Sequence, residues 1–273
     1  MNNLSIQALL LGMLQGLTEF LPVSSSAHLI LLPWFLRWNN PLVDSLTFDV
    51  ALHAGTLLAI LWYFWRDWVE LFGGFCRVLA RRKAEDSQER LIIYIILSTI
   101  PAAVAGFLLE KTVEGSFRNP ALIVLPLAAV SFLMIYAESR PHPSHPLDAL
   151  RLKDALIIGC AQALALLPGV SRSGITISTG LFRGYRRDAA TRFSFLLSTP
   201  VIAGAALLHL GHLPRNMVSE WPIFAVGFAS SGITGYLSIA FLIRFLRRHT
   251  LNVFAGYRLA VAGILIFWTF WRG

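Results

Sequence analysis

Long apolar stretches separated by short polar segments dominate this sequence. Each of six stretches is about 20 residues long, and a helix of about 20 apolar residues crosses the roughly 30 Å of hydrocarbon in a bilayer. The stretches cover residues 45–65, 91–110, 119–137, 188–210, 221–243 and 250–271. The pattern therefore predicts six membrane-spanning helices.

Two further apolar segments, residues 4–36 and 152–183, are too long for one span, and each is interrupted by a proline followed by serines. Basic residues flank the second segment on both sides, which places both of its ends on the same side of the membrane. Irregular backbone at membrane depth is tolerated only where it lines a polar cavity. We therefore expect two re-entrant helical hairpins.

The two hairpins share a pattern of residues, and three spans follow each of them. The matching stretches are Gly12–Gln15 with Gly159–Gln162 and Ser24–Ser26 with Ser171–Ser173. This similarity predicts two repeats, at residues 1–138 and 151–273, each a hairpin plus three spans. Three is an odd number of crossings, so the second repeat is expected to be inverted in the membrane. Such repeats place their site where the two broken helices meet, near the midplane.

Composition and charge support this interpretation. The chain is 56% hydrophobic and 14% charged, with a mean hydropathy of +0.63, which indicates an all-α polytopic membrane protein. Sixteen of its 23 Lys and Arg residues lie within residues 66–90, 138–154, 183–192 and 244–248. The positive-inside rule places these segments in the cytoplasm and both termini outside. The net charge of +8 thus reflects topology, and we expect no nucleic-acid partner.

The tip of the second hairpin has the composition of a phosphate site. Gly169 permits a tight turn, and the helix that follows presents free backbone N–H groups. Arg172 adds a planar set of donors, and hydroxyls come from Ser171, Ser173 and Thr176. Guanidinium, hydroxyls and a helix N-terminus together bind phosphate groups.

The first tip supplies complementary groups. Gln15 and Glu19 are four residues apart and share one helix face. The carboxylate of Glu19 can hold a divalent cation or accept a proton. Ser24, Ser25 and Ser26 precede His28. A serine hydroxyl could act as the nucleophile, and the imidazole of His28 could transfer its proton. Ionisable groups at this depth are expensive and point to function.

Other interpretations of these residues exist. Asp49, His53 and Arg258 are expected to form structural pairs rather than to line the site. A transporter also uses inverted repeats with re-entrant hairpins, but it needs no nucleophile–base pair, so Ser25 with His28 favours an enzyme. A purely structural membrane subunit would leave Glu19 and Arg172 unexplained.

Residues 15–28 (QGLTEFLPVSSSAH) and 168–176 (PGVSRSGIT) resemble the two signature motifs of the undecaprenyl-diphosphate phosphatase family of bacterial inner membranes. The similarity extends to residues 192–200 and covers essentially the whole chain. The resemblance implies hydrolysis of undecaprenyl diphosphate to undecaprenyl phosphate, which recycles the lipid carrier of peptidoglycan synthesis. It also implies Mg²⁺ or Ca²⁺ as cofactor, and bacitracin resistance when the protein is abundant.

The resemblance and the residues together suggest a mechanism. Ser25 is the expected nucleophile by its position in the motif, with His28 as proton acceptor and then donor; attack by water activated by His28 or Glu19 is the alternative. Arg172 and the second tip stabilise the phosphoryl group. Gln15 stands where many members carry Glu, so the cation is expected mainly at Glu19, with Gln15 as a weaker ligand. The site should face the outside, with the prenyl tail along apolar helices. The sequence leaves the oligomeric state open, a homodimer included.

Overall fold

The computed structural model describes residues 3–43, 45–116, 120–140, 144–210 and 217–272, and within these ranges it describes side chains outside 110–121, 209–219 and 270–272. This part of the chain is helical and contains no β-strand. The α-helices are α1 (Asn3–Phe20), α2 (Ser25–Leu36), α3 (Leu46–Tyr63), α4 (Trp65–Arg81), α5 (Ser87–Ser116), α6 (Pro120–Glu138), α7 (Leu152–Ala163), α8 (Arg172–Phe182), α9 (Arg187–Leu210), α10 (Met217–Phe245) and α11 (Asn252–Arg272). Two short 3₁₀ helices, η1 (Leu147–Ala149) and η2 (Leu164–Leu166), flank α7.

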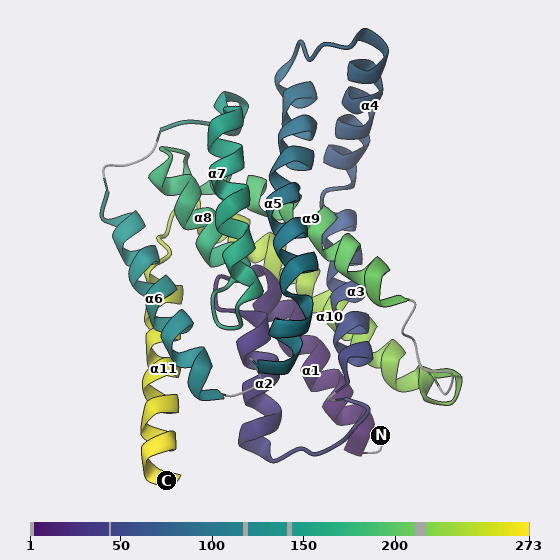
Figure 1. Cartoon of the computed structure of the whole chain (residues 1–273), viewed down its shortest axis with the longest axis vertical. Coiled ribbons are helices and arrows are strands. Elements are labelled where there is room, and N and C mark those ends of the chain that lie inside the picture. The colour runs from purple at the N-terminus through teal and green to yellow at the C-terminus, as the bar shows by residue number, and fades with distance from the viewer. Residues whose placement is uncertain (1–2, 44, 117–119, 141–143, 211–216, 273) are drawn as a thin grey trace.

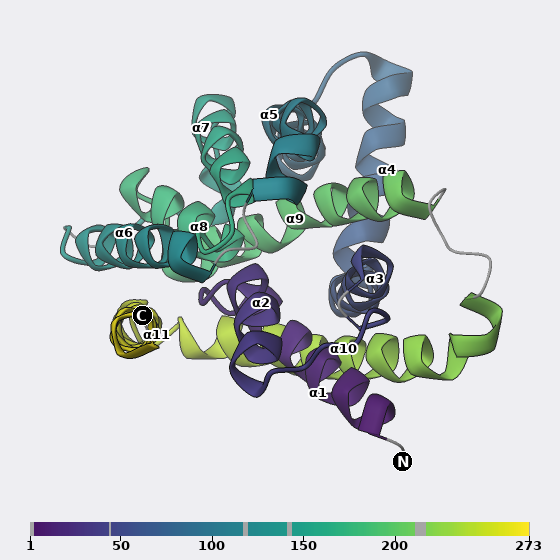
Figure 2. The ribbon, with the colours of Figure 1, turned by 60° about the horizontal axis from the view of Figure 1, so that its bottom comes forward.

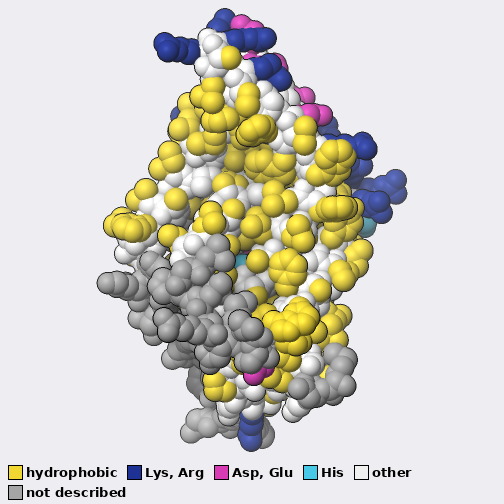
Figure 3. All heavy atoms as spheres, turned by 90° about the vertical axis from the view of Figure 1, so that its right-hand side faces the viewer, with side chains coloured by type: hydrophobic (Ala, Val, Ile, Leu, Met, Phe, Trp, Pro, Cys, Tyr) yellow, Lys and Arg dark blue, Asp and Glu magenta, His cyan; other side chains and the backbone are white. Residues whose placement is uncertain are grey.

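Each of the six predicted spans coincides with one helix, in the order α3, α5, α6, α9, α10 and α11. Within the described residues, five of these helices are long and apolar enough to cross a membrane, and the described part of α6, Leu122–Glu138, is a shorter apolar helix. Figure 3 shows the resulting apolar surface, with Lys and Arg side chains gathered mainly at one end of the molecule. The predicted class, an all-α polytopic membrane protein, is confirmed.

Both long interrupted segments fold as two helices joined by a short irregular turn. The first runs from α1 to α2 and the second from α7 through η2 to α8. Pro22 and Pro168 lie in the turns, where the missing backbone donor of proline costs no helical hydrogen bond. The residue before each second helix, Ser24 or Ser171, has a left-handed backbone with φ of 80° or 66°.

The two hairpins approach the centre from opposite ends of the molecule (Figure 1). The open end of α1–α2 lies at the same end of the molecule as the end of α11, and that of α7–α8 lies at the end where α4 and α5 project. Helix α1 packs against α10, and α7 packs against α5, the corresponding helix of the other half. Helices α3 and α9 also contact each other, as do α6 and α11, which lie side by side in Figures 1 and 2. Two repeats related by a two-fold axis would produce such pairs, because each helix of one repeat meets the counterpart of its partner in the other. The inversion of the second repeat and the boundaries at residues 1–138 and 151–273 stay predictions.

Small residues let the first hairpin approach α10 very closely. A β-carbon at Gly16 would lie 2.6 Å from the backbone nitrogen of Gly235, and one at Gly12 would lie 2.5 Å from the carbonyl oxygen of Gly227. Close backbone approach at glycines is typical of helix packing in membranes, where van der Waals contact drives association. The aromatic ring of Phe20, the last residue of α1, then packs edge-to-face on Phe195 of α9, with ring centroids 5.5 Å apart.

Two features at the end of the molecule marked by α4 were not predicted. Helix α4 is amphipathic and joins α5 through a hydrogen bond from Arg77 Nε to Glu89 Oε1 (2.8 Å). The composition of residues 66–90 predicts a basic cytoplasmic segment but not this helix. The second hairpin is held closed at its base by Asp154, which accepts hydrogen bonds from Arg183 Nε (2.7 Å) and the Tyr185 hydroxyl (2.8 Å). Burial and this bond to Asp154 raise the pKa of Tyr185 to about 12, so its hydroxyl keeps its proton at physiological pH.

Candidate functional site

The tips of the two hairpins meet inside the protein. The guanidinium of Arg172, the first residue of α8, forms an ion pair with the carboxylate of Glu19 near the end of α1. The Ser173 hydroxyl donates to the carbonyl oxygen of Leu21 at 3.2 Å. These residues are about 150 positions apart in the sequence, and the prediction that the tips meet is confirmed.

Glu19 is the centre of the polar contacts at this junction. Its side chain is only 6% exposed, and Arg172 takes one carboxylate oxygen, Oε1. The other oxygen, Oε2, accepts hydrogen bonds from Ser25 Oγ (2.6 Å) and Gln15 Nε2 (3.0 Å). Gln15 and Glu19 thus share a helix face, as the four-residue spacing predicts. His53 of α3, which the sequence assigned a structural role, lies with Nε2 3.7 Å from Oε2 and joins the site.

The hydroxyl of Ser25 is paired with Glu19 and not with His28. His28 turns back toward the start of α2, where Nδ1 lies 2.7 Å from the carbonyl oxygen of Ser24. A carbonyl oxygen can only accept, so Nδ1 carries a proton, and in the neutral ring Nε2 accepts from the Tyr257 hydroxyl at 2.8 Å. The expected pairing of Ser25 with His28 is therefore absent from the structure. The proton acceptor beside Ser25 is a carboxylate.

The second tip repeats the local geometry of the first. Gly169 has φ of 95°, and a β-carbon there would lie 2.9 Å from the carbonyl oxygen of Ile123, so the tight turn requires glycine. The hydroxyls of Ser171 and Ser173 lie 3.4 Å apart, just as those of Ser24 and Ser26 lie 3.2 Å apart. Both tips therefore present a pair of neighbouring hydroxyls.

Two residues of the expected phosphate site also bind the rest of the protein. Arg172 Nη1 donates to the carbonyl oxygen of Ser198 in α9 at 3.2 Å. The Thr176 hydroxyl lies 2.7 Å from the Arg172 carbonyl oxygen and 2.6 Å from the Ser194 hydroxyl, which places it in the interface between α8 and α9. The tip is thus anchored on α9 while Arg172 reaches across to Glu19.

Sequence reasoning missed Tyr257 and underestimated its neighbour Arg258. Tyr257 stacks on His28 with ring centroids 5.7 Å apart, but a tyrosine in an apolar helix carries no signal of its own. Arg258 is completely buried and donates to the carbonyl oxygen of Gly169 at 2.8 Å. A signal for Arg258 existed, because a cation inside an apolar span is costly.

A metal ion would find few protein ligands at this junction. The described residues contain no group of three His, Cys, Asp or Glu side chains that could hold one. The carboxylate of Glu19 is the acidic group at the tips, and the side-chain oxygen of Gln15 is buried and has no hydrogen-bond partner. One carboxylate and one free amide oxygen suit a cation that takes its remaining ligands from substrate phosphates and water.

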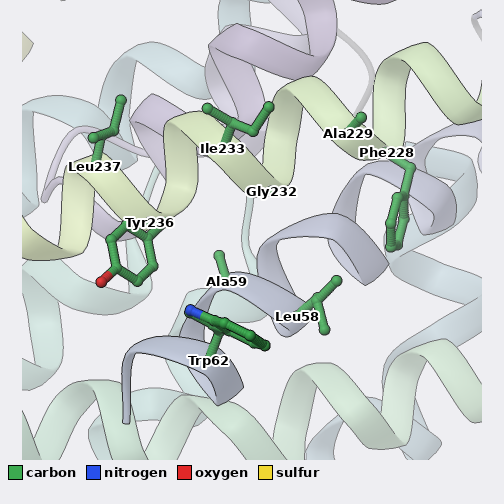
Figure 4. A pocket seen from close by; sticks show the side chains of 9 residues that line it. All are labelled: Leu58, Ala59, Trp62, Phe228, Ala229, Gly232, Ile233, Tyr236 and Leu237. Atoms are coloured by element: carbon green, nitrogen blue, oxygen red, sulfur yellow. The ribbon is translucent and has the colours of Figure 1, made fainter. Parts of the chain in front are cut away.

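An apolar groove of about 400 Å³ lies between α3 and α10 (Figure 4). Leu58 and Trp62 of α3 line it, together with Gly232 and Tyr236 of α10. Leu58 and Trp62 follow His53 by five and nine residues, which at about 100° per residue places them roughly 140° and 180° around the helix. The groove therefore opens on the other face of α3 from the junction and is not part of it.

The fold and the junction define a polytopic helical membrane protein with a charged, hydroxyl-rich site between two broken helices. Residues 8–264 match the family described as "Bacitracin resistance protein BacA", and the chain belongs to this family. It is 47% identical over 265 residues to the "Undecaprenyl-diphosphatase" of Moorella thermoacetica, which covers 96% of this chain and 98% of that protein. It is 48% identical over 258 residues to the protein of the same name from Geotalea daltonii, which covers 93% and 94%.

Proposed function

We propose that this protein hydrolyses undecaprenyl diphosphate to undecaprenyl phosphate and inorganic phosphate in the membrane. The observation that carries the proposal is the junction at Glu19, where one carboxylate contacts both the Ser25 hydroxyl and the Arg172 guanidinium. A nucleophile with its base, next to a cation, is the arrangement that phosphoryl transfer needs. Relatives named undecaprenyl-diphosphatase, similar over nearly their whole length, point to the lipid diphosphate as substrate.

In the first step, Ser25 Oγ attacks the terminal phosphorus and its proton passes to Glu19 Oε2, 2.6 Å away. The bond between the terminal phosphorus and the bridging oxygen breaks. Glu19 returns the proton to that oxygen, so undecaprenyl phosphate leaves and phosphoserine remains. When Glu19 takes the proton and loses its negative charge, the Arg172 guanidinium can pair with the phosphoryl oxygens instead. Its planar shape lets it bind two of these oxygens at once.

In the second step, water attacks the phosphoserine, the phosphorus–Oγ bond breaks to release phosphate, and a proton from the water ends on Oγ, which restores the Ser25 hydroxyl. We assign this transfer to His28, which takes the proton at Nε2 once the water replaces the Tyr257 hydroxyl as the partner of this nitrogen, and then passes it to Oγ. The phosphates accept hydrogen bonds from four serine hydroxyls, those of Ser24, Ser26, Ser171 and Ser173. Gly169 allows the tight turn before Ser171, and Thr176 anchors the start of α8 on α9. Direct attack by water on the diphosphate is the competing mechanism, and the experiment below separates the two.

The divalent cation, Mg²⁺ or Ca²⁺, is part of the same proposal. Glu19 and the free side-chain oxygen of Gln15 are the groups that would hold it, together with the diphosphate. Once bound, it would neutralise charge on the diphosphate. We also propose that the site opens toward the outside of the bacterial inner membrane, because the first hairpin is expected to enter from that side. The prenyl tail then stays among the apolar, lipid-facing helices.

The decisive experiment measures phosphate release from undecaprenyl diphosphate by the purified protein in detergent, with the terminal phosphate radiolabelled. Acid quenching during turnover should leave label on the wild-type protein. Ser25→Ala should leave none and should slow release by about 10³-fold or more. Ser26→Ala changes a neighbouring serine whose hydroxyl contacts Ser24 Oγ rather than Glu19, and it should lose about tenfold at most, the size of one hydrogen bond.

Three other results would contradict parts of the proposal. Near-normal release by Ser25→Ala without labelled protein would establish attack by water. If the wild-type protein is labelled but Ser26→Ala is as inactive as Ser25→Ala, the assignment of Glu19 as the base for Ser25 is wrong. Binding of the lipid by the wild type with no release of phosphate would favour a transporter.

A further inference from the structure

Arg258 of α11 is a completely buried cation whose hydrogen-bond partners are neutral. Its Nη2 donates to the carbonyl oxygen of Gly169 at 2.8 Å and lies 3.3 Å from that of Val170. Its Nε donates to the Ser131 hydroxyl of α6 at 3.1 Å. The ion pairs found among the described residues do not include it. A guanidinium buried in this way costs stability, and in a membrane helix it is a functional hypothesis by default.

Arg258 Nη2 contacts four carbonyl groups, two of them in α6, at Pro126 and Leu127, and the other two, at Gly169 and Val170, in the turn of the second tip. In a trans peptide unit the carbonyl and the N–H point in opposite directions. Drawing the Val170 carbonyl toward Arg258 therefore turns the N–H of Ser171 away from it. Ser171 is the N-cap of α8, and Arg172 follows it. The buried guanidinium thus fixes the direction of the backbone from which Arg172 starts.

The residue before Arg258 reaches the other tip. The Tyr257 hydroxyl contacts His28 Nε2 at 2.8 Å, and the two rings are nearly parallel, at 10°. Neighbouring residues of a helix point about 100° apart. Helix α11 can therefore direct one side chain at each tip from a single turn, and its packing against α6 keeps that turn in place.

We propose that Tyr257 and Arg258 are positioning residues for the hydrolysis, and that α11 sets the geometry of both tips through them. Arg258 orients the backbone and the Arg172 guanidinium of the second tip toward the phosphoryl group. Tyr257 holds His28 of the first tip in one ring orientation and one tautomer. This inference rests on the proposed function, and neither residue is required to touch the substrate.

The test compares kcat and KM for undecaprenyl diphosphate in three variants of α11. Arg258→Lys keeps the charge but cannot place separate donors at the tip carbonyl groups, which Nη2 bonds, and at the Ser131 hydroxyl, which Nε bonds, so we expect kcat to fall about 100-fold with KM within about threefold of wild type. Tyr257→Phe keeps the ring and the fold and should lower kcat about tenfold, again with little change in KM. Gly256→Ala is the matched control, because a β-carbon there meets no atom within 4 Å, and it should leave both constants unchanged.

A variant that only destabilises α11 distinguishes a positioning role in catalysis from a purely structural role. Leu265→Ala opens a cavity at a fully buried position of α11 and should lower Tm while leaving kcat close to wild type. The inference is overturned if Tyr257→Phe keeps wild-type kcat, or if Arg258→Lys loses no more activity than Leu265→Ala at a similar Tm. If Arg258→Lys does not fold, Tyr257→Phe still decides. Absence of phosphate release by the wild type would instead refute the proposed function, and this inference with it.

Discussion

Replacement of Glu19 by glutamine removes one charge at the point where both tips meet. The amide has nearly the shape of the carboxylate but can neither take the proton of Ser25 nor balance the charge of Arg172. The Arg172 and Glu19 side chains are 14% and 6% exposed, so their ion pair is largely shielded from water. Breaking such a pair by removing one partner typically costs about 3–5 kcal/mol. Loss of a general base typically costs about 10²–10⁴-fold in rate.

We therefore expect Glu19→Gln to lower both activity and stability, by different mechanisms. Phosphate release should fall by at least about 100-fold. The Tm in detergent should fall by on the order of 10 °C, from the cost of leaving Arg172 buried without its counter-charge. Adding Arg172→Met should restore much of the Tm, because an apolar replacement of both partners is often neutral, while activity stays lost.

The assays are phosphate release and thermal unfolding of the same preparations, measured for both single variants and the double variant. An unchanged Tm in Glu19→Gln would mean that the ion pair does not hold the tips together. A double variant less stable than either single variant would contradict the coupling between these two residues. Turnover close to wild type in Glu19→Gln would remove Glu19 as the acceptor of the Ser25 proton.

Three further predictions follow from the same contacts. Arg172→Lys should fold but lose about 100-fold or more in phosphate release, because an ammonium cannot bond the Ser198 carbonyl and also bridge two phosphate oxygens; activity near wild type would place the anion site elsewhere. A chelator should abolish release and Mg²⁺ restore it, with Gln15→Ala needing several-fold more Mg²⁺; an unaffected rate in chelator would exclude the cation. In a background lacking the exposed Cys76 and Cys160, a cysteine at Asn3 should react with an impermeant reagent from outside and one at Ser87 should not; equal labelling would contradict the topology.

The arrangement of helices could be predicted from the sequence because it follows from local physics. Apolar length gives the spans, and prolines with flanking serines give the breaks in α1–α2 and α7–α8. Even the meeting of the tips follows, since two broken helices in a bilayer must shield their irregular backbone against each other. Helix α4 could not be predicted in this way, because a basic amphipathic helix has the same composition as a solvated loop.

The side-chain contacts of the site could be predicted only in part. The four-residue spacing of Gln15 and Glu19 fixes a shared face, and the structure shows the hydrogen bond between them. The partner of Ser25 depends instead on which way the His28 ring turns, and the nearby Ser24 carbonyl decides that. Contacts such as His28 with Tyr257 span more than 200 residues and carry no local pattern.

The two tips share one backbone conformation but place residues of different chemistry at the start of their second helix. Ser24 and Ser171 both adopt a left-handed conformation that most residues avoid and that costs on the order of 1 kcal/mol or more. The next residue is therefore the first of its helix in both tips, and it is Ser25 in one and Arg172 in the other. Glu19 contacts both of these side chains. The similarity of the tips brings these two positions to one carboxylate, and the difference between them provides a nucleophile on one side and an anion ligand on the other. A serine at both positions would leave the site without its anion ligand, and an arginine at both would leave it without its nucleophile.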